Sequence, residues 1–471
     1  MEAAALVRAI VQSGQPAVVQ RLPVVGWAAI NEWTPEKLLR RLDRNALPLV
    51  DESSSPAFWW YDEFRQMGNA PLRLSAARRH GRENVSLEDF LRGRPALPPS
   101  SPPRYRQMNA KLVGHLATLA ADAHPRRFLH VSAEPLADES LGKLLSDGAI
   151  EAACPENERE SACHARLWAG EAGTASHAHY DGVANWFVQV HGRKRVLLWT
   201  PQDWEAMRLH PHPHPAHRQS QIDMEEGKKA TAGSASSSSD DASDDAGNQD
   251  DADSKNDEDA TPRAPPAPNA TIVLSPGDAL FIPPFWFHRI ESLDFTTALS
   301  VTSQVEIGTR FDRACRVGLP STVLDRAASP AQRAEAAHRF LSLVVLRAHR
   351  GRTADAVASM NSLRRGRHAP LAVPMRCASG WKGECSHGGR MAAAAAVASR
   401  EESALAAAVA QVIVRDPARR SSAHTVVDEG EGLGQPLRGA EAIILHDYVE
   451  HVAGFAVGMQ ALCGFISKCF R

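Results

Sequence analysis

Three residues from two distant parts of the chain have the types and spacing of metal ligands. His179 and Asp181 are separated by a single residue, and His288 lies in a later segment. Because residues two apart in a β-strand lie on the same face, His179 and Asp181 can point to one centre, and a third ligand from another strand can complete it. Two imidazoles and one carboxylate on one side of an ion leave the other side open. This is the arrangement of non-haem Fe(II) centres that also bind a cosubstrate and dioxygen.

Each cluster taken alone also has a simpler interpretation. His179 and Asp181 would then form a hydrogen-bonded surface pair, and His288 would be a core histidine with satisfied polar atoms. His177 shares the strand face of His179. Only His179 gives the His-x-Asp spacing, so we expect His177 to lie outside the set of ligands, either behind it or in solvent.

A longer pattern surrounds the three residues. It consists of His179-Tyr-Asp181, the segment from Asn185 to Pro201, Pro276-Gly-Asp278, and the segment from Trp286 to Ser292. Together these segments resemble the JmjC, or cupin-like, 2-oxoglutarate oxygenases, and the likeness is greatest to the asparaginyl hydroxylase that inhibits hypoxia-inducible factor. The resemblance covers about residues 16–304 without an insertion described below.

The resemblance implies an α+β fold. Its core would be a double-stranded β-helix, a cupin-like jelly roll, with helices around it and a helical C-terminal tail. It also implies that His179, Asp181 and His288 bind Fe(II), with 2-oxoglutarate as cosubstrate and dioxygen as oxidant. Lys194 corresponds to the family's lysine that pairs with the distal carboxylate of 2-oxoglutarate, and such a carboxylate requires a positive partner when it is buried.

Three further positions correspond to the family's cosubstrate site. Ser176 takes the place of a threonine, Asn185 matches an asparagine near the metal, and Thr302 stands where relatives carry an asparagine. A tyrosine that the family has on an earlier strand is absent from 128–132, where His130 or Ser132 is its candidate replacement. These departures concern cosubstrate binding, whereas all three iron ligands are present.

Arg218 and Gln219 resemble a pair that contacts the target residue in the family's asparaginyl hydroxylase. A guanidinium and a carboxamide can donate to and accept from a side-chain amide. We therefore expect hydroxylation of a protein side chain, with asparagine as the first candidate. The alternatives are a histone lysine demethylase, a tRNA-nucleoside hydroxylase and a binding module without catalytic activity.

Two other groups of potential ligands are weaker. His210, His212 and His214 alternate with prolines, and His217 follows. Proline favours an extended segment with a period of three, which scatters alternate side chains around its axis, so this part predicts a loop. Cys377, Cys385 and His387 provide half of a zinc site, but a second pair of ligands at the required spacing is missing.

Apolar patterns predict the elements that must position these residues. We expect strands at 127–131, on both sides of Gly192 within 186–199, at 271–274 and 279–282 around a turn at 275–278, and at 297–301. Helices are expected to begin near Thr34 and to cover 331–347 and 391–414, with a loop or link over 362–390. The succession of short strands is typical of a sandwich or barrel.

The chain divides into regions of different composition. We assign 1–125 to an N-terminal helix and strand segment that packs on the core, 126–304 to the catalytic core, and 305–471 to a mainly helical C-terminal region. Within the core, 227–268 is rich in Ser, Asp and Pro and offers too little apolar surface to fold. We expect a disordered acidic insertion that acts as a spacer and offers sites for phosphorylation.

Length and charge limit the remaining possibilities. The 471 residues are 43% hydrophobic and suffice for two or three domains, and the formal charge of -2 gives no general reason to expect nucleic acid or an anionic membrane as partner. A nucleic-acid partner remains an alternative, but the sequence does not argue for it. Seven cysteines form no dense framework and there is no secretory pattern at the start, so we expect a reducing compartment, the cytoplasm or the nucleus.

The end of the chain carries a heptad pattern. Apolar residues recur at spacings of three and four, at Leu445, Val449, Val452, Ala456, Met459, Cys463 and Ile466. Such a stripe favours one helix that pairs with its copy in a homodimer. The alternatives are a helix packed on its own domain and a short membrane anchor that uses Gly454 and Gly458, although the apolar run is shorter than the roughly 20 residues that span a bilayer.

Overall fold

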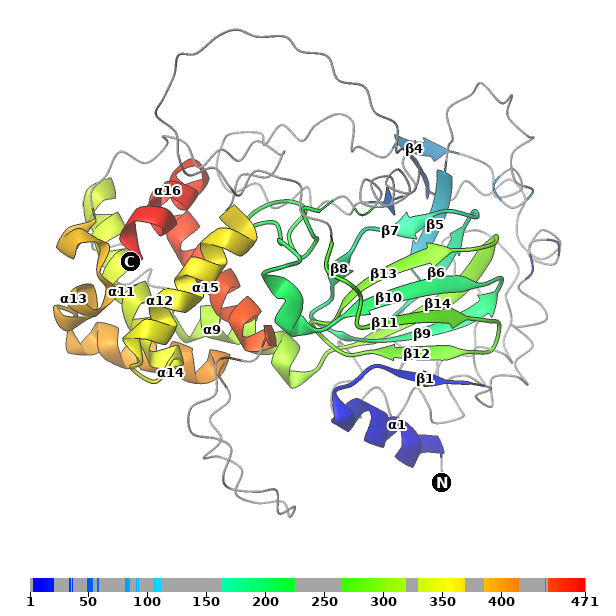
Figure 1. Cartoon of the computed structure of the whole chain (residues 1–471), viewed down its shortest axis with the longest axis horizontal. Helices are drawn as coiled ribbons and strands as arrows, with labels where there is room; N and C mark the ends of the chain where they lie inside the picture. Colours follow the sequence, from blue (N-terminus) through cyan, green and yellow to red (C-terminus); the bar gives the residue numbers. More distant parts are fainter. Residues whose placement is uncertain are drawn as a thin grey trace, which may run out of the picture.

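The computed structural model describes residues 3–20, 49–53, 57–58, 81–84, 105–111, 163–222, 265–318, 329–368, 385–414 and 439–470, together with a few single residues between them. Its strands form two facing sheets, and most of its helices gather at one end of this sandwich (Figure 1). The predicted α+β architecture with a jelly-roll core is confirmed.

The larger sheet has eight antiparallel strands. In spatial order they are β1 (Ala17–Val19), β12 (Ala279–Ile282), β9 (Ala184–His191), β14 (Thr296–Ser303), β6 (Cys163–Gly170), β5 (Tyr105–Lys111), β2 (Leu49–Ser53) and β4 (Gly81–Asn84). The pairs β14–β6 and β14–β9 are the longest ladders, so β14 lies at the centre of the layer.

The smaller sheet faces the larger one. Its strands are β11 (Ala270–Leu274), β10 (Lys194–Trp199), β13 (Phe287–Ser292), β7 (Ala175–Ser176) and β3 (Ala57–Phe58), and β8 (His179–Tyr180) also pairs with β13. The pairing of β3 with β7 is parallel, and the other described pairs of this sheet are antiparallel.

The tight turns of the core join strands of opposite sheets. At Gly192 the chain passes from β9 in the larger sheet to β10 in the smaller one, and at 275–278 it passes back from β11 to β12. Gly192 has φ 66°, and a Cβ atom there would collide with the carbonyl oxygen of Phe295, so only glycine fits this corner. The predicted strands and turns are present, but neither turn closes a hairpin.

Apolar side chains of the two sheets meet between the layers. The residues of this inner cluster are Phe187, Leu280, Ile282 and Ala298 from the larger sheet and Val196, Leu198 and Leu274 from the smaller sheet. They alternate with outward residues along each strand, as expected when one face of a strand is buried. The alternation also decides which polar side chains point inward.

The helices are grouped in sequence after the core. α1 (Ala3–Ser13) precedes β1 and η5 (Pro201–Trp204) follows β10. The others are η6 (Glu306–Thr309), α9 (Arg310–Gly318), α11 (Pro330–Ala348), α12 (Thr353–Leu363), η7 (Arg364–His368), η8 (Ser386–Gly389), α13 (Met391–Ala396), α14 (Arg400–Ile413), α15 (Gly439–Val457) and α16 (Met459–Cys469). A second apolar cluster includes Trp199 and Phe287 of the core with Phe340 and Val449 of the helices, so the two regions share buried surface.

Several expected elements differ in detail. α11 matches the predicted helix at 331–347, whereas the predicted helix at 391–414 is divided into α13 and α14 because Ser399 caps a new start with Glu402 in a capping box. The predicted loop at 362–390 begins with the end of α12 and the π-helical turn η7. The strand expected at 127–131 and most of the helix expected after Thr34 lie outside the described residues.

The expectation of one continuous C-terminal helix is wrong. α15 and α16 are separated at Gly458, which has φ 82°, and the two helices are bent by 114°. Leu445, Val449 and Val452 are fully buried inside the chain, so this part of the stripe packs on its own domain. Self-association therefore stays a prediction without this support. Among the described residues, no single helix is long and apolar enough to span a membrane, and only the bent pair reaches that criterion jointly.

A disulfide joins Cys385 to Cys469, which ties the segment before η8 to the end of α16. The fold brings together two residues 84 positions apart, a pairing that the cysteine spacing did not predict, and the expected reducing compartment stays a prediction. The bond also removes Cys385 from any zinc site, and Cys377 lies outside the described residues.

Of the predicted insertion at 227–268, only 265–268 lie within the described residues. The indole N–H of Trp199 donates a hydrogen bond of 2.8 Å to the carbonyl oxygen of Pro266, and β11 follows directly. The segment before the insertion is also held by the core, because the N–H of Ser220 donates to the carbonyl oxygen of Ala178 at 2.9 Å. The disorder of the remaining insertion stays a prediction.

Candidate metal centre

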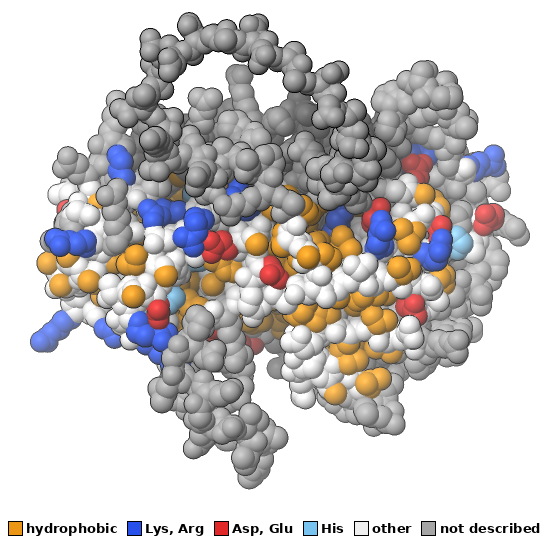
Figure 2. All heavy atoms as spheres, viewed as in Figure 1, with side chains coloured by type: hydrophobic (Ala, Val, Ile, Leu, Met, Phe, Trp, Pro, Cys, Tyr) orange, Lys and Arg blue, Asp and Glu red, His pale blue; other side chains and the backbone are white. Residues whose placement is uncertain are grey.

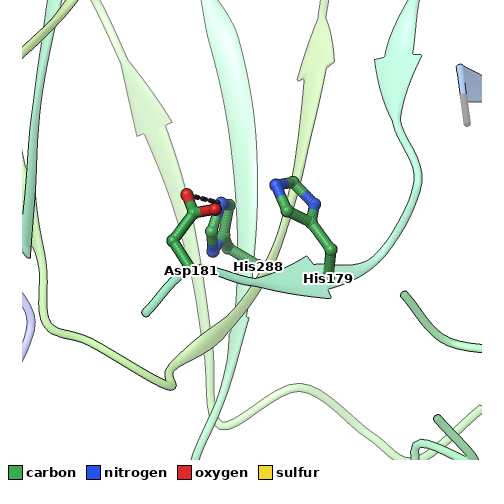
Figure 3. Close-up of side chains that lie close together, drawn as sticks. All are labelled: His179, Asp181 and His288. Atoms are coloured by element: carbon green, nitrogen blue, oxygen red, sulfur yellow. Dashed lines mark ion pairs between the residues drawn. The ribbon is translucent and has the colours of Figure 1, made fainter. Parts of the chain in front are cut away.

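β8 and β13 bring the three predicted ligands together. His179 and His288 are direct partners in the ladder between these strands, and Asp181 follows β8 by one residue. Their side chains point toward a common space (Figure 3), and one ligand atom from each lies within 4.8 Å of the others. Nε2 of His288 is 3.7 Å from Oδ2 of Asp181. Within the described part of the chain, no other group of three such side chains meets this distance limit.

Backbone contacts orient both imidazoles. Nδ1 of His179 lies 2.7 Å from the carbonyl oxygen of His177, and Nδ1 of His288 lies 3.1 Å from that of Trp286. Because a carbonyl oxygen only accepts, each Nδ1 atom carries the hydrogen and each Nε2 atom keeps its lone pair. Metal-binding histidines typically use their second nitrogen in this way. The contacts thus favour the tautomer that a metal requires.

The charge state of His288 agrees with the same role. Burial, with a smaller contribution from the nearby His179, lowers the pKa of His288 to about 4, although Asp181 and the carbonyl group of Trp286 act in the opposite direction. The imidazole is therefore neutral near pH 7, which is the form that binds metal. Two imidazoles and one carboxylate fit an Fe(II) ion and leave its remaining positions open.

Lys194 lies on the inner face of the smaller sheet. Lys194 pairs with Ser292 across β10 and β13, and Leu198 pairs with His288. Lys194, Val196 and Leu198 are alternate residues of β10, so they share one face. The side chain of Lys194 is buried, Nζ donates a hydrogen bond of 3.2 Å to Oγ of Ser292, and burial lowers its pKa to about 8. At roughly 3.3 Å per residue, Ser292 lies about 13 Å along β13 from His288. Lys194 and His288 therefore face the same interior at separate positions along the sheet.

The other predicted cosubstrate residues lie around the same interior. The hydroxyl of Ser176 accepts a hydrogen bond of 3.0 Å from the N–H of Ile290, between His288 and Ser292 on β13. Asn185 is buried and pairs with Thr302 across β9 and β14.

Ser300 is a polar residue of this site that the sequence reasoning missed. Its hydroxyl donates a hydrogen bond of 2.9 Å to Oδ1 of Asn185, and Ser300 itself is buried. It stands two residues before Thr302 and therefore on the same face of β14. This alternation is the sequence signal that would have identified it.

Arg218 and Gln219 lie beside the metal ligands. Gln219 forms an isolated β-bridge with His179, and Nη1 of Arg218 is 4.0 Å from Oδ1 of Asp181. Arg218 is partly exposed, whereas Gln219 is buried. His177 is also buried, and its Nε2–H donates a hydrogen bond of 2.8 Å to the carbonyl oxygen of Ser220, so it supports this loop and does not join the ligand set.

The histidine and proline segment forms a compact loop. His210, His212, His214 and His217 are all buried, in contrast to the predicted extended conformation. Two successive turns, with hydrogen bonds from His214 to Pro211 and from His217 to His214, fold the segment back on itself. The loop assignment is confirmed.

The profile of the family described as cupin-like domain matches residues 3–302 of this chain. The chain belongs to the cupin-like domain family. The matched range contains the two sheets and the three candidate ligands, and the family assignment agrees with the predicted resemblance at this level.

Named relatives of this cupin-like protein carry out different functions. It is 28% identical over 164 residues to lysine-specific demethylase 8 of Xenopus tropicalis, which covers 34% of this chain and 30% of the relative. It is also 28% identical over 130 residues to tRNA wybutosine-synthesizing protein 5 of Gallus gallus, which covers 28% of this chain and 30% of the relative. The chain thus matches about a third of the length of these relatives. An X-ray structure of E. coli ycfD has 11% identity, a TM-score of 0.27 and coverage of 67% of this chain and 56% of that chain.

Proposed function

We propose that this cupin-like protein is an Fe(II)- and 2-oxoglutarate-dependent oxygenase that hydroxylates a protein side chain. The observation that carries the proposal is the convergence of His179, Asp181 and His288 within 4.8 Å, with both imidazoles held by backbone carbonyl groups. When bound together, Fe(II), 2-oxoglutarate and dioxygen supply the chemistry that converts a C–H bond to C–OH, with succinate and carbon dioxide as the other products.

The residues of the chain bind and orient the reactants. The three ligands would hold the iron on one side, and Lys194 would pair with the distal carboxylate of 2-oxoglutarate. Ser176, Asn185 and Thr302 would provide further polar groups for the cosubstrate, and their contacts with Ile290, Ser300 and each other support this role.

Apolar side chains exclude water from the reaction space. Phe187, Val196 and Leu198 lie in the cluster between the two sheets and are buried. Exclusion of water protects a reactive centre from side reactions and strengthens the polar contacts inside it.

The substrate proposal rests on the loop beside Asp181. Arg218 offers a partly exposed guanidinium at the edge of the metal centre, and Gln219 offers a carboxamide next to His179. These groups suit an asparagine side chain, because an amide both donates and accepts hydrogen bonds. The protein would then act on an Asn-containing segment of another protein.

The relatives' names mention lysine-specific demethylation and tRNA wybutosine synthesis. They keep two alternatives in view for this chain, a histone lysine demethylase and a tRNA-nucleoside hydroxylase. On the face shown in Figure 2, Lys and Arg side chains of the described residues are interspersed with acidic and hydrophobic ones. This face carries no clustered basic surface of the kind on which RNA binding usually relies among the described residues. A protein substrate stays the first candidate on the basis of Arg218 and Gln219.

Mass spectrometry of candidate substrates tests this proposal. Asn-containing peptides, methyl-lysine histone peptides and tRNA are incubated separately with the full chain, Fe(II), 2-oxoglutarate and air. We expect a gain of one oxygen atom on the Asn peptides, which disappears when His179 and Asp181 are changed to Ala. His191→Ala is the control, since its side chain stands at the far end of β9. Products only from methyl-lysine or tRNA would assign a different substrate, and equal products from the double variant would contradict the proposed centre.

A further inference from the structure

The residue between the two ligands of β8 connects the metal centre to the helical region. Tyr180 is buried, and its ring packs against Phe285 and Phe287 at centroid distances of 5.4 and 5.5 Å. Its hydroxyl donates a hydrogen bond of 3.2 Å to Oδ2 of Asp447 on α15. A side chain from the ligand segment thus ends on a helix that is distant in sequence.

Asp447 belongs to a buried group of charged side chains. Nη1 of Arg367, from η7, lies 2.6 Å from Oδ1 of Asp447 and 2.6 Å from Oε2 of Glu450. Nε2 of His368 lies 2.6 Å from the other carboxylate oxygen of Glu450. The side chains of Arg367 and Glu450 are 1% and 0% exposed. Buried charges are costly unless their partners stay in place, so each member of this group fixes the others.

The same group holds the loop at 209–222, which carries the candidate substrate residues. The N–H of His212 donates a hydrogen bond of 2.9 Å to Oε2 of Glu450. The side-chain amide of Gln221 donates one of 3.0 Å to the carbonyl oxygen of Arg367. One side of the loop is therefore attached to α15 and η7.

The opposite side of the loop is attached to the ligand segment. The N–H of Tyr180 donates to the carbonyl oxygen of Arg218 at 3.2 Å, and the N–H of Ser220 donates to that of Ala178 at 2.9 Å. β8 itself consists of only His179 and Tyr180, which pair with His288 and Phe287 of β13. A strand this short gains little from its own ladder, so its position depends on neighbouring contacts.

A second contact from the helical region reaches the other end of the ligand segment. Gly308 in η6 lies so close to the carbonyl oxygen of Gly182 that any side chain at position 308 would collide with it. Gly182 directly follows Asp181. The ligand segment is thus supported from both sides by residues that come after the core.

We propose that Tyr180, Asp447, Arg367 and Glu450 form a positioning network for the metal centre. The network holds β8 and the loop at 209–222 in the relative position at which the metal ligands and Arg218 address the same space. These four side chains are positioning residues, because they act through β8 and the loop and belong to neither the ligand set nor the cosubstrate site. The inference rests on the proposed function for the role of the metal, whereas the support of the loop is independent of it.

Two variants disturb the network mildly, and a third is a matched control. Tyr180→Phe removes only the hydroxyl that reaches Asp447, and Asp447→Asn keeps an acceptor for that hydroxyl but removes the charge beside Arg367. Tyr448→Phe also deletes one buried hydroxyl from α15, and that hydroxyl has no hydrogen-bond partner among the described residues. All three are made in the full chain.

The first measurement is amide hydrogen exchange without metal. We expect residues 178–180 and 209–222 to exchange several-fold faster in Tyr180→Phe and faster still in Asp447→Asn, with no change at these residues in Tyr448→Phe. Uniform acceleration over the whole chain would indicate general destabilisation and would overturn a local positioning role. Unchanged exchange in Tyr180→Phe and Asp447→Asn would also overturn it.

The second measurement is a spectroscopic titration with Co(II) as a probe of the three ligands. We expect Tyr180→Phe to bind Co(II) about three- to tenfold more weakly than the wild type, because it loses one hydrogen bond that holds the ligand segment. We expect no change in Co(II) affinity for Tyr448→Phe. A Tyr180→Phe affinity equal to that of the wild type would show that the network does not position the ligands. If the wild type binds no Co(II) while the exchange result holds, the metal centre fails and the support of the loop stands.

Discussion

At the scale of single residues, Lys194 links burial to cosubstrate recognition. Its ammonium group is buried, and among the described contacts it donates to the neutral hydroxyl of Ser292. Burial without a nearby carboxylate lowers its pKa to about 8. A dicarboxylate that enters the interior would supply the missing negative charge and would be held by charge-assisted hydrogen bonding.

Lys194→Ala should greatly raise the concentration of 2-oxoglutarate that the protein requires. The variant leaves a buried carboxylate without a partner, which costs on the order of 2 to 4 kcal/mol of binding free energy. Calorimetric titration of 2-oxoglutarate measures the change, and Arg195→Ala on the outward face of β10 is the control. An unchanged affinity in Lys194→Ala would remove this residue from the site.

The affinity for 2-oxoglutarate should also fall as the pH rises above 8. The cosubstrate needs the protonated form of Lys194, and this form is depleted in the free protein above its pKa of about 8. At pH 9 the affinity should be about tenfold lower than at its plateau below that pKa. Lys194→Arg should abolish this dependence, because a guanidinium stays charged throughout this range. A wild-type affinity that is constant from pH 7 to pH 9 would contradict the assignment.

At the scale of elements, α15 shows why a sequence stripe can mislead. The heptad pattern identifies one apolar face correctly, but α15 is buried on most sides, including Asp447 and Glu450. Those charged residues would be exposed on a simple amphipathic helix. Arg367 explains their burial, because its guanidinium forms ion pairs with both carboxylates. No local sequence pattern connects Arg367 to α15.

Val452→Glu should strongly destabilise the protein. Val452 is 0% exposed, and a buried unpaired carboxylate costs several kcal/mol of folding free energy. Phe455→Glu is the matched control, because Phe455 is 55% exposed on the same helix. Thermal unfolding with sedimentation distinguishes the alternatives. A stable Val452→Glu variant that only changes from dimer to monomer would restore the dimer seam that the sequence suggested.

The ends of the insertion should differ in their importance. Replacement of 227–262 by a short Gly and Ser link should change the melting temperature little, because the predicted segment has too few apolar residues to pack. Extension of the deletion to 268 removes the carbonyl group of Pro266 that accepts from Trp199. This leaves a buried donor unsatisfied at a cost of about 1 to 3 kcal/mol. Equal melting curves for both deletions would contradict this distinction.

At the scale of the whole molecule, short-range patterns predicted the core better than its surroundings. Alternation and turn residues located the strands around Gly192 and 275–278, and the His-x-Asp spacing with the later His288 located three side chains that the fold brings within 4.8 Å. The crossing between sheets at those turns was not predicted, because alternation within a strand does not specify its partner. The contact of Tyr180 with Asp447 depends on packing between elements distant in sequence, for which a single sequence has no local signal. The bend at Gly458 did have a local signal, a glycine inside the apolar stripe, which the heptad interpretation passed over.

Turnover of 2-oxoglutarate by the full chain tests the proposed metal centre most directly. Succinate is measured with Fe(II) and air for the wild type, for the variant with both His179→Ala and Asp181→Ala, and for His191→Ala. We expect succinate from the wild type and His191→Ala, and none above background from the double variant, because one remaining ligand cannot hold Fe(II) in place. Release of succinate by the double variant at the wild-type rate would contradict the account.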